Sequence, residues 1–452
     1  MALPVSGARA DRDVSGTYYL RSFGCQMNEH DAERISALLE ARGLRRTARP
    51  DDADVLVYNT CTVRKSADER LAGHLGTAAR LKREHPGRVV LVTGCLPQAE
   101  QADFFRRFPF VDGALGPQNL HRLPDLLEAA VEPAVQPVGF FEDGPAMSGD
   151  LAARRERPYQ AWVQIMSGCT NFCSYCIVPH VRGPERSREL ETVVAEVRGL
   201  VADGVREVTL LGQNVNAYGL DLRRAGRADA PDFPALLRAL DEVPALSRVR
   251  FMTSHPRDLS DELVRAVAEL PSVCEHVHLP AQSGSDRVLG AMRRGYTAAQ
   301  YLERVQALRR AVPDVHVTTD LIAGFPGETD EEFAETLALV RAAEFDAAFT
   351  FVFSPRRGTD AADLPRQVAE PVRRERVEQL IALTQEYALA SRQRWVGRRA
   401  EVLVEGMSRD GVLRRGRTRQ NVTANVAGPT EPGAIVDVEV TAATSTTLRG
   451  RV

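Results

Sequence analysis

Three cysteines lie close together in the stretch "SGCTNFCSYC" (167–176), and they are Cys169, Cys173 and Cys176. Thiolates at such spacing bind a metal ion or an iron–sulfur cluster, and a tetrahedral metal needs a fourth ligand. No histidine or cysteine follows at ligand spacing before His180, which lies beyond a proline. Three thiolates can instead hold three irons of a [4Fe–4S] cube and leave one iron open to a small molecule. The spacing predicts such a cluster, and a zinc site completed by His180 or Cys274 is the alternative.

Three further cysteines are far apart in the sequence but share one context. Each follows a short apolar run predicted to be a strand, and they are Cys25, Cys61 and Cys95. The carboxyl ends of parallel strands share one edge of a sheet, where ligands bind. The three thiolates would converge there, and Gly24 and Gly94 would allow tight turns beside them. We therefore predict an auxiliary iron–sulfur cluster with an open iron, and buried apolar cysteines are the alternative.

The composition is that of an ordinary globular protein. The chain has 452 residues, of which 44% are hydrophobic and 26% charged, and its net charge is -3. Its length allows two to four domains. Seven cysteines, partly clustered, are unlike a disulfide framework. The first residues lack the apolar core of a signal peptide, and no stretch reaches the length of a membrane span. We expect a cytoplasmic protein with no membrane partner.

The first third of the chain alternates between predicted strands and helices. Strands are expected at 17–22, 54–59, 88–94 and 111–115, and helices at about 28–43, 65–84 and 119–130. This alternation predicts an α/β domain over residues 15–130 with a flavodoxin-like, doubly wound parallel sheet. We expect residues 1–14 to be a disordered tail. Residues 131–154 carry Pro and Gly without periodicity, which indicates a linker.

The rest of the chain divides into an alternating part and an all-β part. Strand candidates in the alternating part are 161–166, 206–212, 248–252, 276–280, 316–324 and 347–353. Six βα units predict a partial, open TIM-like (β/α)6 barrel over residues 155–386. A long charged helix is expected at 366–395. In residues 387–452, short alternating strands with glycine turns predict a small OB-like β-barrel of five strands.

Several motifs resemble those of one enzyme family. "GCTNFCSYC" (168–176) resembles the signature of radical S-adenosylmethionine (SAM) enzymes, and the two cysteine triplets together resemble the methylthiotransferases. The resemblance covers roughly residues 15–452 and implies a methylthiotransferase N-terminal domain, a radical SAM core and a C-terminal TRAM domain. Other matching stretches are "RGPERSRE" (182–189), "LLGQNVNAYG" (210–219), "DLIAGFPGET" (320–329) and "GRTRQNVTANVAG" (416–428).

One motif favours a branch of this family. "GCQMNEHD" (24–31) resembles the members that act on isopentenyladenosine in tRNA. The expected product carries a methylthio group on carbon two of the isopentenyl (dimethylallyl) adenosine next to the anticodon. Members that act on threonylcarbamoyladenosine in tRNA or on a ribosomal-protein aspartate are the alternatives. A non-catalytic, metal-containing RNA-binding protein is the alternative of another class.

The resemblance also implies cofactors, partners and residue roles. The first triplet would hold a [4Fe–4S] cluster that binds SAM and cleaves it to a 5′-deoxyadenosyl radical, with Tyr175 packed on the adenine. A second [4Fe–4S] cluster at Cys25, Cys61 and Cys95 would deliver sulfur, which another SAM molecule methylates. The implied partners are the tRNA anticodon stem-loop, an electron donor and a sulfur source. We expect a monomer.

Amide side chains follow two predicted strands of the partial barrel. Gln213, Asn214 and Asn216 follow the second strand, and Gln282 and Ser283 follow the fourth. Amides can bind the amino and carboxylate groups of the methionine moiety or the edge of a base. We expect Gln213, Asn214 and Gln282 to contact the cofactor, and capping of turns is the alternative.

The C-terminal segment is basic within an acidic chain. Residues 392–452 contain eleven arginines and six acidic residues, a net charge of +5. Guanidinium groups bind phosphates with an affinity that falls as salt rises. A cluster on one predicted hairpin is expected to contact RNA and comprises Arg414, Arg415, Arg417 and Arg419. An ordinary solvated face is the alternative.

Overall fold

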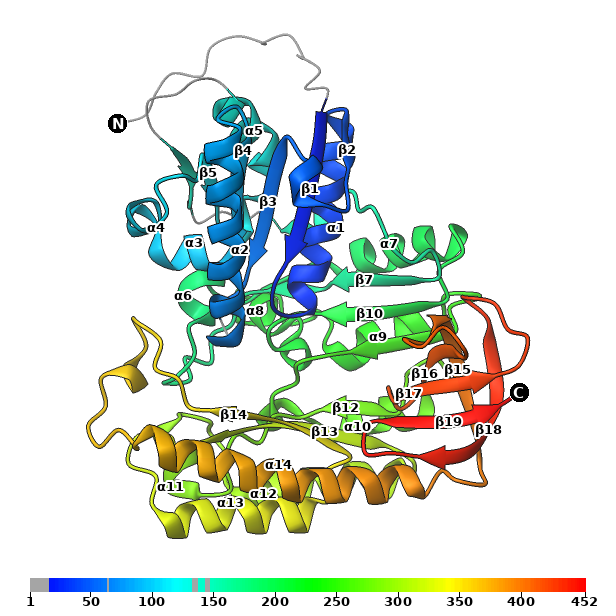
Figure 1. The fold of residues 1–452 in the computed structure, drawn as a ribbon. Coiled ribbons are helices and arrows are strands. Elements are labelled where there is room, and N and C mark those ends of the chain that lie inside the picture. The colour runs from blue at the N-terminus through cyan, green and yellow to red at the C-terminus, as the bar shows by residue number, and fades with distance from the viewer. Residues whose placement is uncertain (1–15, 63–64, 132–136, 143–146) are drawn as a thin grey trace. The chain divides into compact units, whose positions relative to one another are not determined.

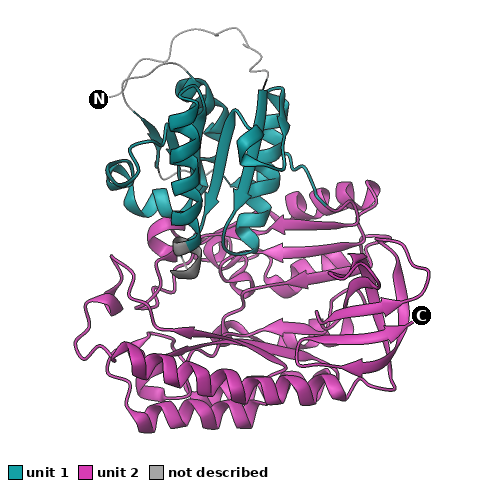
Figure 2. Cartoon of the chain, in the orientation of Figure 1, with its two compact units in different colours: residues 1–156 teal, residues 157–452 magenta. Residues whose placement is uncertain are grey.

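A computed structural model describes residues 16–62, 65–131, 137–142 and 147–452 of the chain. The tail expected at 1–14 lies outside these residues. The chain forms two compact units, unit 1 (Met1–Glu156) and unit 2 (Arg157–Val452), which Figure 2 colours separately. Among the described helices, none combines the length and the apolar character needed to cross a membrane.

Unit 1 contains a six-stranded parallel sheet (Figure 1). Its strands are β1 (Gly16–Ser22), β2 (Leu44–Arg46), β3 (Val55–Thr60), β4 (Val89–Gly94), β5 (Gly113–Leu115) and β6 (Val138–Phe140). The strand order is β2-β1-β3-β4-β5-β6, and every neighbouring pair is parallel. The order reverses between β1 and β3, which is the switch point of a doubly wound sheet. The predicted flavodoxin-like fold is confirmed.

Apolar side chains cover both faces of this sheet. The helices are α1 (Gln26–Ala41), α2 (Lys65–Glu84), α3 (Cys95–Glu100), α4 (Ala102–Arg107) and α5 (Leu123–Val131). On β3, Leu56 belongs to the core that contains Leu71 of α2, whereas Val57 belongs to the core that contains Ile35 of α1 and Leu126 of α5. Burial on both faces explains why the central strands are continuous apolar runs instead of alternating ones.

Two strands of unit 1 lie where the sequence predicted none. β2 and β6 have three residues each, which is too short for a periodic pattern to be recognised. β6 lies in the segment expected to be a linker and pairs with β5. The same segment contains a 3-10 turn, η3 (Ser148–Asp150), in which Ser148 Oγ donates to Asp31 Oδ1 of α1 at 2.7 Å. The described residues of this segment thus belong to the fold of unit 1.

Unit 2 begins with six parallel strands in two three-stranded sheets. The first sheet has the order β11-β10-β7 and the second β12-β13-β14. The strands are β7 (Gln160–Gln164), β10 (Glu207–Leu211), β11 (Arg248–Phe251), β12 (His276–His278), β13 (His316–Ala323) and β14 (Ala347–Val352). A parallel bridge from Val249 to Val273 links the two sheets. The predicted partial, six-stranded barrel is confirmed.

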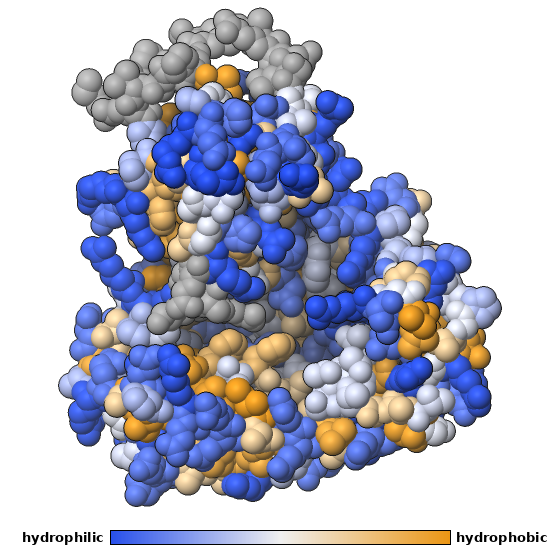
Figure 3. Space-filling view, viewed as in Figure 1, coloured by the Kyte–Doolittle hydropathy of each residue, from blue (hydrophilic) through white to orange (hydrophobic). Residues whose placement is uncertain are grey.

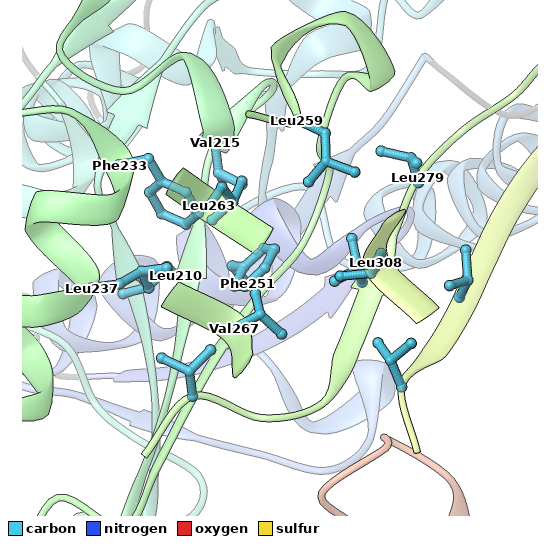
Figure 4. Close-up of a cluster of buried hydrophobic side chains, with 14 of the residues drawn as sticks. Leu210, Val215, Phe233, Leu237, Phe251, Leu259, Leu263, Val267, Leu279 and Leu308 are labelled. Atoms are coloured by element: carbon cyan, nitrogen blue, oxygen red, sulfur yellow. The ribbon is translucent and has the colours of Figure 1, made fainter. Parts of the chain in front are cut away.

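Helices connect consecutive strands and pack on the outside of this partial barrel. They include α7 (Leu190–Ala202), α9 (Phe233–Asp241), α10 (Asp261–Glu269), α12 (Ala298–Ala311), α13 (Asp330–Ala343) and, after β14, α14 (Glu370–Gln393). Figure 4 shows Phe251 of β11 among Phe233, Leu237 and Leu263 of the flanking helices. The Phe233 and Phe251 rings meet edge to face, with centroids 5.1 Å apart. Each such side chain contributes about 1.5–3 kcal/mol by its burial.

The last sixty residues form a closed barrel of five strands. Its strands are β15 (Arg399–Met407), β16 (Arg414–Thr418), β17 (Thr423–Ala427), β18 (Ile435–Ala443) and β19 (Thr447–Arg451). Their order is β15-β16-β17-β19-β18, and β17 pairs with β19 in parallel whereas the other pairs are antiparallel. The OB-like barrel predicted from the short alternating strands is confirmed.

The small barrel covers the amino-terminal end of the partial barrel through buried arginines. Arg250 donates to Glu207 Oε2 at 2.8 Å and to the Thr418 and Arg419 carbonyl oxygens at 2.7 Å each. Arg248 donates to Glu401 Oε1 at 2.8 Å. Glu207 and Arg248 are the first residues of β10 and β11. Because the small barrel covers the amino-terminal end, an active site of the partial barrel is expected at its carboxyl end.

The surface is of mixed polarity. The face shown in Figure 3 is mainly hydrophilic, and most of its hydrophobic patches belong to unit 2. Exposed large apolar side chains of unit 2 include Phe172, Phe349 and Met407. Single exposed apolar residues are normal on a folded protein.

Glu207→Gln tests the buried ion pair at the base of the partial barrel. The change leaves Arg250 buried without its carboxylate, so the free energy of unfolding at pH 7 should fall by about 3 kcal/mol in urea denaturation. Burial raises the pKa of Glu207, but Arg250 and Arg248 outweigh burial, and the net pKa is lowered. A carboxyl with a lowered pKa loses its stabilising contribution as pH falls, so the difference should shrink below about pH 4.3.

The matched control is Glu439→Gln, because Glu439 pairs with Arg451 on the surface. An exposed ion pair contributes little, so this variant should unfold like the wild type. Equal destabilisation by both changes would contradict a special role for the buried pair.

Candidate functional site

The loop with Cys169, Cys173 and Cys176 begins at the carboxyl end of β7. Two short strands, β8 (Met166–Ser167) and β9 (Arg186–Ser187), pair antiparallel and close it. Inside this ribbon, Cys169 N donates to Gly183 O at 3.1 Å. Gly168 has φ +78°, and a Cβ atom there would lie 1.9 Å from Pro184 O. Only glycine can therefore occupy the position before Cys169.

Neighbouring segments hold this loop in place. Gly168 N donates to Gln213 Oε1 at 2.6 Å, so the expected cofactor ligand Gln213 supports the loop through its oxygen. Ser174 Oγ donates to Ala291 O at 2.8 Å, and Arg257 Nη2 donates to Asn171 Oδ1 at 2.7 Å. The positions of the three thiols are thus determined by contacts from several barrel loops.

Burial disfavours the charged form of these thiols. Cys169 and Cys173 are buried and Cys176 is partly buried. Burial raises the pKa of Cys169 to about 11 and that of Cys176 to about 12, and the neighbouring thiols of the triplet add to both shifts. Binding to a metal centre deprotonates thiols and offsets this cost.

The zinc alternative finds no support at this loop. Cys274 lies just before β12, at the amino-terminal end of the barrel, where it is buried. His180 lies on α6 (Val178–Arg182) with its side chain exposed. Over the described residues, no three His, Cys, Asp or Glu side chains are grouped closely enough to hold one metal ion. In a [4Fe–4S] cube, three thiolates bind three different irons, so a cluster does not require the three sulfurs to meet at one metal ion.

Tyr175 packs in an apolar cluster beside the loop. This cluster includes Val288, Met292, Phe325 and Phe353. Burial raises the pKa of the Tyr175 phenol well above its usual value. The ring thus packs on this apolar cluster, while Cys176 is the next residue in the chain.

Polar side-chain atoms without hydrogen bonds gather at the carboxyl end of the partial barrel. They come from the loops after β10, β11 and β12, where the described structure gives them no hydrogen-bond partner, and they are Asn214 Oδ1, Ser254 Oγ, His255 Nε2 and Gln282 Oε1. All four residues are at most 7% exposed. Buried polar groups are almost always hydrogen-bonded. This set therefore fits a polar ligand such as the methionine part of SAM.

His255 offers a donor among these atoms. Burial, with Arg294 and Arg257 nearby, lowers the pKa of His255 to about 2, so its ring is neutral. Its Nδ1 accepts from Arg257 N at 3.3 Å, which assigns the proton to Nε2. The sequence analysis did not predict Ser254 or His255 as ligand contacts, because only the fold buries them.

Other polar side chains at this end form hydrogen bonds with neighbouring parts of the protein. Asn216 exchanges two hydrogen bonds with the His255 backbone, and Ser283 Oγ lies 3.2 Å from Thr336 Oγ1. Asn214 Nδ2 donates to Asp258 Oδ2 at 2.9 Å and leaves its oxygen for a ligand. The backbone of Gln282 has φ +69° and forms hydrogen bonds with β13. Asn214 and Gln282 remain candidates for cofactor contacts.

Unit 1 brings the loops of the other three cysteines together. Cys25 precedes α1, Cys61 follows β3 and Cys95 begins α3. Gly24 has φ +130°, and a Cβ atom there would lie 2.3 Å from Cys61 Cβ. Gly94 has φ +101°, and its Cβ would lie 2.3 Å from Thr60 O. The three loops thus touch at the carboxyl edge of the sheet.

Asn28 joins these loops from a fully buried position. Its Nδ2 donates to Thr60 O at 3.0 Å, and its Oδ1 lies 3.2 Å from Cys25 Sγ. Asn59 Nδ2 donates to Asn28 O at 2.8 Å, and Thr60 Oγ1 donates to Thr93 O at 2.8 Å. The sequence analysis missed this network, although Asn28 lies within the motif that carried the resemblance.

The arginine cluster of the small barrel divides into two pairs. Arg419 makes a two-pronged ion pair with Glu275, and this pair raises its pKa despite burial. Arg417 pairs with Glu405 at 3.4 Å, and burial lowers its pKa. Arg415 is exposed, and Arg414 lies 3.0 Å from Met407 Sδ and 3.3 Å from the carboxylate of the exposed Glu431. Arg414 and Arg415 are thus the members best placed to contact an RNA.

Three family descriptions match successive parts of the chain. The uncharacterized protein family UPF0004 matches residues 17–116, the radical SAM superfamily matches 163–340, and the TRAM domain matches 393–452. These segments coincide with the doubly wound sheet, the partial barrel and the small barrel.

Relatives match nearly the whole chain. A tRNA-2-methylthio-N(6)-dimethylallyladenosine synthase of Caldicellulosiruptor saccharolyticus is 45% identical over 412 residues, covering 91% of this chain and 86% of the relative. Its counterpart in Acidothermus cellulolyticus is 47% identical over 446 residues, covering 98% and 88%. The radical SAM methyltransferase TsrM of Kitasatospora setae, solved with cobalamin and a [4Fe–4S] cluster, shares the fold. Its TM-score is 0.56 at 17% identity, over 77% of each chain.

Gly24→Ala tests whether the three loops of unit 1 form one site. The added Cβ would meet Cys61 and force the Cys25 and Cys61 loops apart. If each triplet holds a cube, the variant should lose about half of its iron after anaerobic reconstitution, as measured by iron analysis. Gly87→Ala is the control, because nothing lies within 4 Å of a Cβ there. Full iron content in Gly24→Ala would refute a shared site.

Proposed function

The chain belongs to the family of tRNA-2-methylthio-N(6)-dimethylallyladenosine synthases, and from this we propose the reaction in detail. It is a radical SAM methylthiotransferase that modifies tRNA. We propose that it places a methylthio group on carbon two of the isopentenyl (dimethylallyl) adenosine next to the anticodon. The observation that carries this proposal is the buried thiol triplet beside unbonded polar atoms at the carboxyl end of the partial barrel.

Cys169, Cys173 and Cys176 hold a [4Fe–4S] cluster in this proposal. Cluster and SAM together supply reductive cleavage of the sulfonium, which makes a carbon radical able to take the unreactive hydrogen from carbon two. The chain binds and orients the SAM: Asn214 and Gln282 offer oxygens to its ammonium group, and His255 offers Nε2–H to its carboxylate. Tyr175 and its apolar neighbours would hold the adenine and exclude water.

Cys25, Cys61 and Cys95 hold a second [4Fe–4S] cluster in this proposal, where sulfur is supplied and methylated by another SAM molecule. The contact of Gly24 with Cys61 and the hydrogen bonds of Asn28 support a common site for their loops. A carbon-centred radical is captured only by a sulfur held close to it. Fixing the sulfur on rigid strand ends meets this need.

The remaining partners follow from the reaction. The small barrel would bind the tRNA anticodon stem-loop through Arg414 and Arg415, while Arg417 and Arg419 stay predictions as RNA contacts. An electron donor and a source of replacement sulfur are needed, and we expect a cytoplasmic monomer. A related substrate, threonylcarbamoyladenosine or a ribosomal-protein aspartate, is the competing proposal. The "GCQMNEHD" motif (24–31) favours isopentenyladenosine.

Cysteine substitutions test the two triplets separately. Cys173→Ala should abolish 5′-deoxyadenosine formation, because SAM cleavage depends on the cluster in the partial barrel. Cys61→Ala should retain some cleavage but form no methylthio product. The measurement is anaerobic turnover with isopentenylated tRNA, followed by mass spectrometry of the nucleosides.

Cys274→Ala is the control for these variants, since this buried cysteine lies at the other end of the barrel and should not affect either product. SAM cleavage by Cys173→Ala, or a methylthiolated nucleoside from Cys61→Ala, would disprove the assigned roles. Absence of product from isopentenylated tRNA with the fully loaded wild type would favour the related substrates.

The double variant Arg414→Gln/Arg415→Gln tests the RNA surface. The logarithm of the tRNA binding constant falls linearly as the logarithm of the salt concentration rises, and each lost phosphate contact reduces the steepness of this fall by about 0.7–0.9. Affinity for tRNA and its salt dependence should therefore both decrease. The control is Arg399→Gln/Arg451→Gln, which changes the net charge equally on other strands of the same barrel. The measurement is tRNA binding at several salt concentrations. Equal loss in both variants would indicate a general charge effect.

A further inference from the structure

Arg294 donates a hydrogen bond to a cysteine of the candidate cluster site. Its Nη1 lies 3.3 Å from Cys173 Sγ, its Nη2 donates to Pro280 O at 3.1 Å, and its Nε donates to Tyr296 Oη at 3.0 Å. The Tyr296 hydroxyl lies 2.9 Å from Ala281 O. The guanidinium is thus held in one orientation, with one edge on the sulfur.

The backbone of this segment directs Arg294 inward. Its neighbours Arg293 and Gly295 both have positive φ, 59° and 71°, and this conformation is unfavourable for Arg293. Arg294 N donates to Leu289 O at 3.0 Å, and Ser174 N, next to Cys173 in the chain, donates to Met292 O at 3.1 Å. The approach of Arg294 to Cys173 is therefore set by backbone contacts and not by a mobile side chain alone.

Among the residues that the structure describes, no carboxylate pairs with the buried charge of Arg294. Only 5% of the residue is exposed. The groups that interact with it most strongly are the phenols of Tyr175 and Tyr296 and the thiol of Cys173. A buried cation without a counter-charge is costly, and arginine cannot give up its proton. The site therefore has a positive charge that an anionic group must balance.

We propose that Arg294 is the built-in counter-ion of the radical SAM cluster and sets its reduction potential through Cys173. This inference rests on the proposed function, which assigns Cys169, Cys173 and Cys176 to that cluster. Three thiolates and a cube bring the negative charge that the guanidinium lacks. A hydrogen bond to a ligating sulfur and a nearby charge are among the determinants of cluster potential.

The sign of the effect follows from electrostatics. Reduction adds one electron to the cluster and breaks no bond, so the reduced form carries one more negative charge. A cation in a buried, low-dielectric site stabilises the reduced form more than the oxidised form. Arg294 therefore raises the midpoint potential and makes the cluster easier to reduce. Arg294 affects the cluster through its hydrogen bond to Cys173 and does not touch the reacting atoms. It is therefore a positioning residue.

The test compares potentials in a chain with a single cluster. The parent carries Cys25→Ala, Cys61→Ala and Cys95→Ala, so that only the partial-barrel cluster remains. Into it are placed Arg294→Met, which removes the charge and the donors, and Arg294→Lys, which keeps the charge. Arg293→Met is the matched control, because Arg293 is the exposed neighbour and pairs with Asp360. The midpoint potential is measured by titration with dithionite and mediator dyes, followed by electron paramagnetic resonance.

Arg294→Met should shift the potential to more negative values. At a fixed applied potential the ratio of reduced to oxidised cluster should fall at least tenfold, which corresponds to about 59 mV for one electron. Arg294→Lys should lie between Arg294→Met and the parent, and Arg293→Met should match the parent. An unchanged potential in iron-loaded Arg294→Met would overturn the inference and leave the proposed function intact.

A second measurement applies if Arg294→Met binds too little iron for its midpoint potential to be determined. Thermal unfolding of the metal-free proteins should find Arg294→Met at least as stable as the parent, because the uncompensated charge is gone. Lower stability of the metal-free variant would show a merely structural role and overturn the inference. A parent that binds no iron at all would overturn the proposed cluster site itself, which distinguishes the two failures.

Discussion

The cost of burying charge governs this protein at each of its candidate sites. A thiolate or a guanidinium inside a protein is tolerated only where an opposite charge or a metal lies beside it. Burial raises the pKa values of Cys169 and Cys176, whereas the buried Arg294 guanidinium donates to the Tyr296 hydroxyl and to the Cys173 thiol. In the proposed function, the binding of an anionic cluster by the thiolates would relieve each of these unfavourable situations.

The polar side chains at the two ends of the partial barrel differ in how fully they are hydrogen-bonded. At the amino-terminal end, Arg248 and Arg250 form ion pairs with Glu207 and with Glu401 of the small barrel, and the four charges balance. At the carboxyl end, polar atoms of Asn214, His255 and Gln282 have no hydrogen-bond partner in the described part of the chain. A satisfied network produces a rigid, sealed base, while an unsatisfied one indicates a place for a ligand. The arginines of the small barrel show the same division, because Arg419 is used by the fold and Arg415 is exposed.

The two cysteine triplets reach their positions by different routes. The loop of the partial barrel carries its three cysteines within eight positions, 169 to 176, so a local pattern suffices to recognise them. The triplet of unit 1 depends on three strands ending at one sheet edge, with Gly24 and Gly94 allowing backbones to touch. Rigid strand ends place sulfur more reproducibly than one flexible loop could.

The sequence by itself determined the order of folds, the family and both cysteine triplets, because alternating apolar runs, glycine turns and short motifs are local. It did not reveal β2 and β6, which are too short to show a period, or the start of α14 at Glu370, where the expected helix began at 366. Only the tertiary structure decided which polar residues belong to the fold and which to a ligand. Gln213 and Arg419 make hydrogen bonds within the fold, whereas His255 Nε2 has no partner among the described residues and is proposed as a ligand contact. Arg294 could not be found from sequence, since its contact with Cys173 joins residues 121 positions apart and depends on burial that only packing creates.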